Sequence, residues 1–537
     1  YLNIDKIISI AKQSKADAIH PGYGFLSENA EFVKKLNKEK IVFIGPNPKA
    51  IKKMGDKIES KNLAIKLKLN VIPGHTAPVK SSKEALSISK KIGFPVLLKA
   101  SAGGGGKGMR IVRTDKELEE NFNAARSESK NSFGDDRVFI EKYIEQPRHI
   151  EIQILCDKYG NQLHLGEREC SIQRRYQKVI EECPSPLVDN EMRESMASQA
   201  LRLANEVGYD SAGTVEFVVD SKKSFYFLEM NTRLQVEHPV TELVTGIDLV
   251  EQMIYCADNK KLKLKQSDIK LNGWSIESRI YAEDPTKDFM PSIGRILEYL
   301  EPDTLNFEDG KVRNDTGITS GSEISIYYDP MISKLAVHHK DRSSAIELMI
   351  NSLQSYYLSG VENNIGFLIS ILNDRKFKQG SLSTNFIKDK FKIGYQPEMG
   401  ITEDIIRKIS IASVLVFIKQ LRKIDFSNSN EFTVKILDQY INLKIEKIKY
   451  SDQGNLISVK IKNDNFTLSS NWKFGEKLFI GEIDNKKEYF KVNKVQNHHK
   501  INIEHLGIKV DVIIFPRHHK DYYEYMPKQS NEDLSRK

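Results

Sequence analysis

The stretch FYFLEMNTRLQVEHPVTE, from Phe225 to Glu242, decides the fold predicted for this chain. An apolar start runs directly into polar residues at mostly two-residue spacing, which are Glu229, Asn231, Arg233, Gln235 and Glu237. Side chains two residues apart share one face of an extended strand. The spacing therefore predicts a strand that presents acids, amides and a guanidinium group along one wall of a cleft.

The preceding strand supplies a second acid for the same wall. Residues 213–219 (GTVEFVV) and 224–231 (SFYFLEMN) have the pattern of a hairpin, which places Glu216 and Glu229 on adjacent antiparallel strands. Two carboxylates on one face of a hairpin are suited to Mg²⁺ that bridges nucleotide phosphates. The hairpin is therefore a predicted metal site.

Composition bounds the class of protein. At 537 residues the chain is too long for one hydrophobic core, and its size predicts about three or four domains. The net charge of +8 comes from lysines spread along the chain, which favours anionic substrates over nucleic acid. No run of eighteen apolar residues occurs, so we expect no membrane span.

Cysteine usage and the chain start bear on the compartment. The four cysteines lie far apart without a CxxC pair, which favours a reducing compartment and argues against structural zinc. The sequence begins at Tyr1 and shows no targeting pattern, so its native N-terminus is not visible. We expect the cytoplasm for a bacterial protein and the mitochondrial matrix for a eukaryotic one.

Residues 1–44 read as alternating helices and strands, with a helix over 27–36 capped by Ser27 and a buried parallel strand over 41–44. HPGYGFLSEN (20–29) falls between a strand and a helix, where α/β sheets bind ligands. Two strands make a thin sheet, so we expect this Rossmann-like part to be incomplete. Residues 45–71 follow as linker and helix, in which Lys57 is either a phosphate-directed cation or a solvated lysine, and spacing alone favours the latter.

The most glycine-dense stretch is FPVLLKASAGGGGKGMRIV, residues 94–112. It formally contains G-x-G-x-x-G, but a strand follows instead of a helix, and Lys107 precedes glycine rather than Ser or Thr as a Walker loop requires. A flap between two strands remains, with backbone amides that can close over phosphates and with Lys99 as a fixed cation. An ordinary flexible hairpin is the alternative.

Two further segments carry polar groups. The strand VFIEKYI (138–144) leaves a small α+β unit at a hinge, where its backbone could recognise a purine edge. In the segment 164–181, Gln173, Arg174, Arg175 and Lys178 would either gather a small anion or form a basic surface turn, and spacing does not decide between them.

Taken in order, HPGYGFLSEN, MGDK, KASAGGGGKGM, EKYI, ECSIQRR and EMNTRLQVEHPVTE resemble the biotin carboxylase component of biotin-dependent acyl-CoA carboxylases. The resemblance covers about residues 1–390. It implies an α/β and α+β architecture with an ATP-grasp fold, in which residues 72–143 are the lid and 144–390 the catalytic body. It also implies ATP, Mg²⁺ or Mn²⁺, and biotin on a carrier domain that this sequence lacks.

The resemblance implies a role for individual residues. The implied ATP contacts are Lys57, Lys99, Gly104, Gly105, Gly106, Glu141, Lys142, Ile144, His149 and Gln173. The implied metal and phosphate residues are Glu216, Glu229 and Asn231. The implied bicarbonate site consists of Arg233, Gln235, Val236, Glu237 and Lys178.

Four of these assignments concern the chemical steps. Glu237 is the implied general base for bicarbonate, Arg233 its bidentate clamp, and Lys178 a further catalytic cation. Arg313, in KVRNDTG, aligns with the arginine that steadies the biotin enolate. Tyr176 stands where the bacterial acetyl-CoA carboxylase form has a histidine, and we do not count it as catalytic. The implied reaction is ATP-dependent carboxylation of biotin through carboxyphosphate.

After residue 394 the composition changes. A long apolar helix over 401–424 precedes eight alternating runs up to Phe515, which predicts a helix followed by a closed antiparallel barrel over 395–525. This arrangement resembles the domain that joins the α subunit of propionyl-CoA carboxylase to its carboxyltransferase β subunit. A purely structural β domain is the alternative. The histidine pairs at 498–499 and 518–519 are expected to be solvated rather than metal ligands.

The C-terminal residues 526–537 have the composition of a linker to a biotinyl domain, which is absent here. We expect an oligomer with carboxyltransferase and biotinyl partners. An acetyl-CoA or methylcrotonyl-CoA carboxylase subunit, an idle ATP-binding scaffold and an ATP-grasp ligase of another kind remain alternatives.

Overall fold

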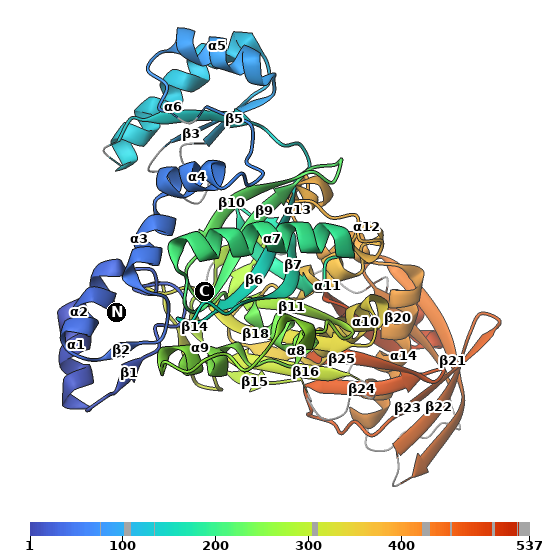
Figure 1. Cartoon of the computed structure of the whole chain (residues 1–537). Helices are drawn as coiled ribbons and strands as arrows, with labels where there is room; N and C mark the ends of the chain where they lie inside the picture. Colours follow the sequence, from blue (N-terminus) through green and yellow to red (C-terminus); the bar gives the residue numbers. More distant parts are fainter. Residues whose placement is uncertain are drawn as a thin grey trace.

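The computed structural model describes residues 1–75, 77–100, 109–133, 135–302, 310–420, 430–451, 454–496, 500–523 and 525. Three parts are visible in Figure 1: a small lobe at the top, a central body built on one large sheet, and a barrel at the lower right. The N-terminal elements lie beside the body.

The N-terminal segment pairs two short parallel strands, as the sequence predicts. Its helix over the predicted 27–36 region begins later, because Asn29 and not Ser27 caps it, accepting a hydrogen bond from the Phe32 amide at 2.9 Å. The region after it holds two helices. The elements are α1 (Ile4–Gln13), β1 (Ala18–Ile19), α2 (Ala30–Lys38), β2 (Val42–Phe43), α3 (Pro48–Gly55) and α4 (Lys57–Lys66).

The top lobe is a three-stranded antiparallel sheet covered by two helices around buried Leu98, Phe122 and Ile140. Its first two strands form the predicted hairpin. The glycine loop with Gly104, Gly105 and Gly106 lies outside the described residues. The elements are α5 (Ser82–Ile92), β3 (Val96–Ala100), β4 (Met109–Val112), α6 (Leu118–Phe133) and β5 (Val138–Lys142).

The central sheet has eight strands in the order β10-β9-β6-β7-β8-β11-β18-β16. Their bounds are β6 (Arg148–Cys156), β7 (Gln162–Arg174), β8 (Gln177–Cys183), β9 (Ala212–Val219), β10 (Phe225–Asn231), β11 (Trp274–Tyr281), β16 (Lys311–Thr316) and β18 (Met331–His339). The sequence YYDPMISKL (327–335) predicts a turn before a helical region, but β18 begins at Met331, so that prediction is wrong.

Alternation along these strands separates a core face from a polar face. On β6 and β9, Ile150, Ile152, Val215 and Phe217 pack against α7 (Asn190–Val207). On β11 and β18, Ile276, Ile280 and Leu335 pack in the same core as α10 (Arg342–Ser355). The residues between them face the other side of the sheet, where α8 (His238–Thr245) contacts β7, β8, β11 and β18.

The stretch from Phe225 to Glu242 is a strand only as far as Asn231. Residues 232–237 form a loop that leads into α8, which begins at His238 with Pro239 in its first turn. The prediction of one extended wall through Glu237 is therefore wrong. The loop still returns Gln235 and Glu237 to the sheet, where both contact residues of its polar face.

Shorter elements complete the body. They are α9 (Leu249–Ala257), β12 (Glu283–Asp284), β13 (Met290–Pro291), β14 (Gly294–Arg295), β15 (Glu298–Leu300), β17 (Glu323–Ile324), β19 (Tyr357–Ser359), α11 (Ile365–Leu372), α12 (Arg375–Lys378) and α13 (Phe386–Lys390).

The C-terminal part is a closed eight-stranded barrel preceded by a long helix, which confirms the predicted architecture. The helix, α14 (Glu403–Gln420), shares one core with inward residues of the barrel such as Val434, Ile457 and Phe479. The other elements are β20 (Glu431–Ile436), β21 (Gln439–Ser451), β22 (Gly454–Ile461), β23 (Asp464–Ser470), β24 (Leu478–Ile483), β25 (Lys486–Gln496), β26 (Lys500–His505), β27 (Ile508–Pro516) and α15 (Lys520–Tyr523).

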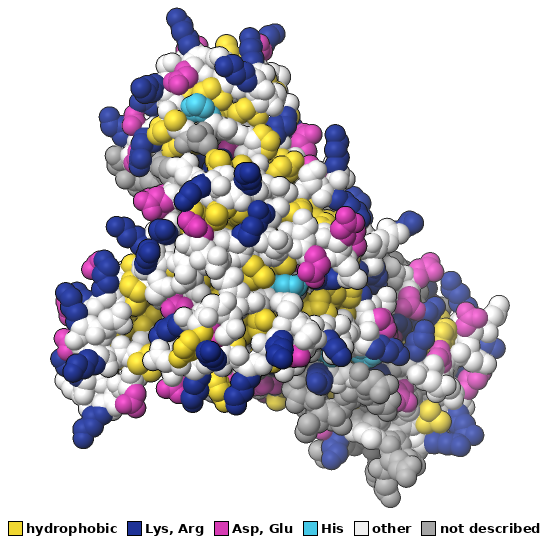
Figure 2. All heavy atoms as spheres, in the orientation of Figure 1, with side chains coloured by type: hydrophobic (Ala, Val, Ile, Leu, Met, Phe, Trp, Pro, Cys, Tyr) yellow, Lys and Arg dark blue, Asp and Glu magenta, His cyan; other side chains and the backbone are white. Residues whose placement is uncertain are grey.

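Two surface observations bear on the class of protein. Among the described residues, no helix combines the length and the apolar composition that crossing a bilayer requires. On the face drawn in Figure 2, Lys and Arg side chains are scattered over the lobe and the body rather than gathered in one patch.

The His518 and His519 rings lie side by side with centroids 4.2 Å apart, and His498 and His499 lie outside the described residues.

Candidate active site

The polar face carries a row of charged residues across four neighbouring strands. Glu229 on β10 pairs in register with Glu216 on β9, which pairs with Glu151 on β6, which pairs with Arg168 on β7. The predicted adjacency of Glu216 and Glu229 is thus present. Glu151 and Arg168 were missed, although Glu151 stands in the strict alternation of residues 147–155, where its position opposite the isoleucines was a usable signal.

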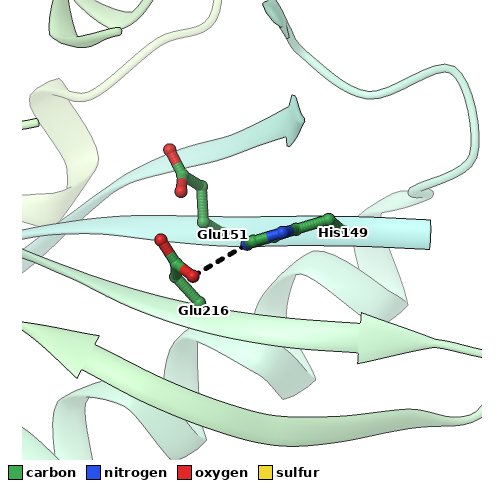
Figure 3. A group of neighbouring side chains, drawn as sticks. All are labelled: His149, Glu151 and Glu216. Atoms are coloured by element: carbon green, nitrogen blue, oxygen red, sulfur yellow. Dashed lines mark ion pairs between the residues drawn. The ribbon is translucent and has the colours of Figure 1, made fainter. Parts of the chain in front are cut away.

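Glu216 stands at the centre of this row. Figure 3 shows it facing His149 and Glu151, which come from the adjacent strand, and His149 Nε2 lies 2.9 Å from Glu216 Oε2. Its other oxygen, Oε1, accepts hydrogen bonds from Lys178 Nζ at 3.1 Å and Asn231 Nδ2 at 2.8 Å. Burial works against the charge, but Lys178 and His149 hold the pKa of Glu216 well below its ordinary value.

Lys178 connects the row to the loop before α8. Its Nζ donates to Glu151 at 2.6 Å, Glu216 at 3.1 Å and Glu237 at 2.5 Å. The tight turn between β7 and β8 has Arg175 and Tyr176 at positive φ, as two-residue hairpin turns require, and sends Lys178 back into the sheet. Burial opposes its charge, yet the three carboxylates raise the pKa of Lys178.

Glu237 is buried between two cations. Besides Lys178, Arg279 on β11 donates from Nη2 to Glu237 Oε2 at 2.9 Å and from Nε to Glu181 Oε1 at 2.6 Å. Despite full burial, these cations hold the pKa of Glu237 well below its ordinary value. Arg279 was missed from the sequence, although it alternates with Glu277 in WSIESRIY, again opposite apolar positions.

Arg233 lies at the edge of the same site. Its Nε donates to Glu28 Oε2 at 3.0 Å and its Nη1 to Gln235 Oε1 at 3.0 Å. Glu28 belongs to the HPGYGFLSEN turn, so the N-terminal segment contacts the site as its position after a strand suggested. The Val236 carbonyl accepts from Lys334 Nζ at 2.9 Å.

Arg313 occupies a different environment. Its guanidinium group binds Glu242 Oε2 at 2.6 Å and Asp315 Oδ1 at 2.8 Å, and its side chain remains 36% exposed, against 9% for Arg279. Within the described residues Arg279, and not Arg313, contacts Glu237. The role predicted for Arg313 at biotin stays a prediction.

The residues implied for ATP fall into two groups. His149 Nδ1 lies 2.7 Å from Gln173 Nε2, inside the carboxylate row. At the base of the lobe, Glu141 binds Lys61 of α4 and Lys99 of β3, the latter at 2.5 Å. Burial works against ionisation, but these two lysines lower the pKa of Glu141 to about 2.

The remaining ATP candidates lie near that hinge. Lys142 donates to the carbonyls of Gly93 and Phe94 at 3.0 and 2.9 Å, and Ile144 is half-buried between β5 and β6. Lys57 is exposed at the start of α4. Two cations of the 164–181 segment bind other acids: Arg174 binds Glu283 at 2.9 Å and Arg175 binds Asp288 at 2.6 Å. They do not converge with Lys178 on one anion.

A divalent cation needs oxygen ligands whose charge is not already neutralised by a neighbouring cation. His149, Glu151 and Glu216 offer ligand atoms within 4.8 Å of one another, but Lys178 already neutralises two of these carboxylates. Glu229 differs, because its carboxylate accepts no hydrogen bond from the described residues, and burial together with Glu216 raises its pKa. A hard cation held by oxygens of Glu229 and Glu216 fits this arrangement.

Family models match the chain in four consecutive stretches. Residues 1–51 match the biotin carboxylase N-terminal domain, 56–265 the carbamoyl-phosphate synthase L chain ATP-binding domain, 277–389 the biotin carboxylase C-terminal domain and 415–529 the propionyl-coenzyme A carboxylase BT domain. Together they span both the catalytic body and the barrel.

Individual relatives match over the whole chain. The mitochondrial propionyl-CoA carboxylase alpha chain of Homo sapiens is 46% identical over 100% of this chain and 74% of its own length, and the alpha chain of Ruegeria pomeroyi is 44% identical over 95% and 78%. A solved biotin carboxylase domain of 2-oxoglutarate carboxylase from Hydrogenobacter thermophilus, in complex with MgADP, ADP and bicarbonate, superposes with a TM-score of 0.68 at 47% identity, over 72% of this chain and 85% of that one. The chain thus belongs to the propionyl-CoA carboxylase alpha-chain family, whose catalytic body is an ATP-grasp biotin carboxylase.

Proposed function

We propose that this chain uses ATP and bicarbonate to carboxylate biotin on a carrier domain, as the first half-reaction of a propionyl-CoA carboxylase. The contact that carries the proposal is Lys178, which holds Glu237 of the bicarbonate loop and Glu216 of the metal pair at once. A site that joins these groups can bring an anionic second substrate to a nucleotide's terminal phosphate.

Glu216, Glu229 and Asn231 are proposed to hold Mg²⁺ or Mn²⁺, which would neutralise charge on the transferring phosphoryl group when bound. The protein's own contribution is a row of fixed charges. His149 and Lys178 keep Glu216 ionised and in place, because His149 Nε2 lies 2.9 Å from one carboxylate oxygen and Lys178 donates to the other. Lys99 at the hinge would add a fixed cation on the nucleotide side.

Glu237 is proposed to take the proton from bicarbonate. Ion-paired to Lys178 and Arg279, this carboxylate is ionised but a weak base. A bound bicarbonate anion would also interact with these cations, and they would then stabilise the ionised carboxylate of Glu237 less. The basicity of Glu237 would then rise at the moment the substrate is present.

The other bicarbonate contacts are proposed from the same loop. Arg233, whose fork is already oriented by Glu28 and Gln235, can clamp a planar anion with two parallel hydrogen bonds. Proposed for nucleotide binding are Lys57, Lys99, Gly104, Gly105, Gly106, Glu141, Lys142, Ile144, His149 and Gln173.

The domain limits and partners are part of the proposal. We assign residues 1–44 to the N-terminal part, 45–71 to a connector, 72–143 to the lid, 144–390 to the body and 395–525 to a barrel that binds a carboxyltransferase β subunit. Support comes from the match of residues 415–529 to the propionyl-coenzyme A carboxylase BT domain. We also propose oligomeric assembly with this subunit and with a biotinyl domain, in the cytoplasm or the mitochondrial matrix, and the mitochondrial and bacterial relatives support this proposal.

Co-purification with a β subunit, followed by an acyl-CoA screen, tests the proposal. Acetyl-, propionyl- and methylcrotonyl-CoA are offered with labelled bicarbonate, ATP and a biotinylated carrier. Label should enter propionyl-CoA fastest. Preferred labelling of either other acyl-CoA would overturn the propionyl assignment, and no labelling of the carrier would overturn the first half-reaction.

A further inference from the structure

A second pair of acids lies behind Glu237, outside the groups that the proposed reaction uses. Glu181 on β8 and Glu277 on β11 are register partners on adjacent antiparallel strands. Both are fully buried, with 0% relative exposure. Among the described residues, Oε2 of Glu181 and both carboxylate oxygens of Glu277 are buried without a hydrogen-bond partner.

The cations near Glu277 are bound to other groups. Arg279 on β11 donates to Glu181 Oε1 and to Glu237. Lys334 on β18 donates to the Val236 carbonyl at 2.9 Å and lies 3.3 Å from Asp315 of β16. Glu277 therefore forms no ion pair with any described residue.

Other titratable groups near the pair are bound to other partners. Lys178 on β8 donates to Glu151, Glu216 and Glu237. Arg313 on β16 binds Glu242 of α8 and Asp315. His238 Nδ1 on α8 donates to the Gln235 carbonyl at 2.8 Å, and burial with Lys334 lowers the pKa of His238 to about 3, so its ring is neutral.

Directly opposed carboxylates on neighbouring strands lie about 4.5–5.5 Å apart at Cβ and repel each other when both are ionised. In a dry site such a pair retains a proton. Burial raises the pKa of Glu181 to about 7 against the pull of Arg279, and burial with Glu181 raises that of Glu277 well above its ordinary value.

We propose that Glu181 and Glu277 share one proton, and that this acid–carboxylate pair positions Arg279 against Glu237. Glu181 needs a single negative charge to anchor the Nε side of Arg279, which leaves Nη2 for Glu237. A second charge on Glu277 would compete for Arg279 and for Lys334. The effect on bicarbonate use, through Arg279 and Glu237, rests on the proposed function, whereas the shared proton does not.

The shared proton is tested by thermal unfolding against pH, with the wild type and Glu277→Gln. A glutamine reproduces the protonated acid. In the unfolded chain a glutamate releases its proton above the ordinary pKa of 4.5, whereas the native pair keeps one proton to higher pH. The folded wild type therefore loses stability relative to the unfolded chain as pH rises through 7 and beyond. Glu277→Gln should not show this loss, so the Tm of the variant minus the Tm of the wild type should increase as pH rises. Infrared spectra should show a protonated-carboxyl band in the wild type that the variant lacks.

Two results would overturn the shared proton. One is a Tm difference that is constant with pH, and the other is a Glu277→Gln protein that becomes less stable relative to the wild type as pH rises. Either would mean that Glu277 is ionised in the native protein. These readouts need no substrate, so they stand even if biotin carboxylation is not the activity.

The positioning role has its own test, because a residue that acts through Arg279 should affect bicarbonate use. Glu277→Leu, which removes the acid, should raise the KM for bicarbonate in ATP cleavage, while Glu277→Gln should keep it near the wild-type value. In the wild type, loss of the shared proton at alkaline pH should also raise this KM, and Glu277→Gln should not show that rise. Failure of glutamine to rescue, or a KM unchanged by leucine, would overturn positioning. Absence of bicarbonate-dependent ATP cleavage in the wild type would overturn the proposed function instead.

Discussion

At the scale of single residues, the site is held together by a few buried charged side chains, each of which contacts several oppositely charged partners. Lys178 contacts Glu151, Glu216 and Glu237, and Arg168 donates to Glu151 at 2.5 Å. Burying charges is costly unless each is paired, and removal of one partner leaves another uncompensated. Exchange of any member should therefore affect both catalysis and stability.

The roles of Arg279 and Arg313 can be separated by matched variants. Arg279→Ala should lower bicarbonate-dependent ATP cleavage by about 100-fold or more, because Glu237 loses a donor to its carboxylate. Arg313→Ala should keep ATP binding and lose biotin carboxylation. Nucleotide binding by calorimetry and carboxybiotin formation are measured for both.

Each outcome refers to one arginine. Wild-type biotin carboxylation by Arg313→Ala would remove Arg313 from the reaction. Full bicarbonate-dependent cleavage by Arg279→Ala, in a protein with normal circular dichroism, would show that Glu237 does not need Arg279.

A second residue-scale prediction concerns the metal pair. Glu229→Gln should weaken Mn²⁺ binding in the presence of ATP by about tenfold, or about 1.4 kcal/mol, since a charged oxygen ligand is lost. Mn²⁺ binding is followed by electron paramagnetic resonance. Glu206→Gln, at an acid on α7 that pairs with Lys66 at the surface, is the control. Equal Mn²⁺ affinity in both variants would contradict the assignment.

Much of this site followed from residue order, and the rest depended on register. The Glu216–Glu229 pair was predictable because a short hairpin fixes which residues face each other. Glu151, Arg168 and Arg279 were not, because their contacts depend on the register between strands, and for Arg279 the partners Glu181 and Glu237 lie far away in sequence. Glu151 is flanked by isoleucines and Arg279 precedes one, but this pattern also fits an exposed strand face.

At the scale of elements, the base of the top lobe joins three segments through one acid. Glu141 at the end of β5 binds Lys61 of α4 and Lys99 of β3. The glutamate is thus both a proposed nucleotide contact and a tie between the lobe and the connector.

The hinge gives a pH-dependent prediction. The lowered pKa of Glu141 means that its contribution is present above the ordinary 4.5 and is lost as pH falls toward about 2. Glu141→Gln should reduce stability at pH 7 by on the order of 3 kcal/mol. The deficit, followed by denaturant unfolding, should shrink with acidification below 4.5. A deficit that is independent of pH would contradict the ion-pair account.

Elements show where local pattern is sufficient. The eight alternating runs predicted the barrel, because period-two alternation at short intervals is typical of half-buried antiparallel strands. The strand β10 ends at Asn231, where a loop leads to α8, and β18 was missed because the YYDP stretch before it predicts only a turn. Elements whose character depends on tertiary partners were the ones predicted wrongly.

At the scale of the whole molecule, the barrel meets the catalytic body at two glycines. A Cβ on Gly507, in the turn between β26 and β27, would lie 2.4 Å from the Gly366 Cα in α11. Leu506 packs against the cores of both parts. This contact sets the position of the barrel relative to the body.

Gly507→Val should therefore shift the barrel and weaken capture of the β subunit while ATP cleavage persists. Gly475→Val is the matched control, because Gly475 also has a positive φ in a barrel turn but has no atom within 4 Å of its Cβ position. Co-purification with the β subunit is compared for both. Equal capture would show that the glycine contact does not orient the barrel.

The most direct test of the account is ATP cleavage by the purified chain, measured with and without bicarbonate and with and without free biotin. The account predicts little ADP release without bicarbonate, release when bicarbonate is added, and further stimulation by biotin with formation of carboxybiotin. Lys178→Met should abolish the bicarbonate dependence, because Glu237 and Glu216 lose their common cation. ATP cleavage that is indifferent to bicarbonate and biotin, or none under any condition, would contradict it.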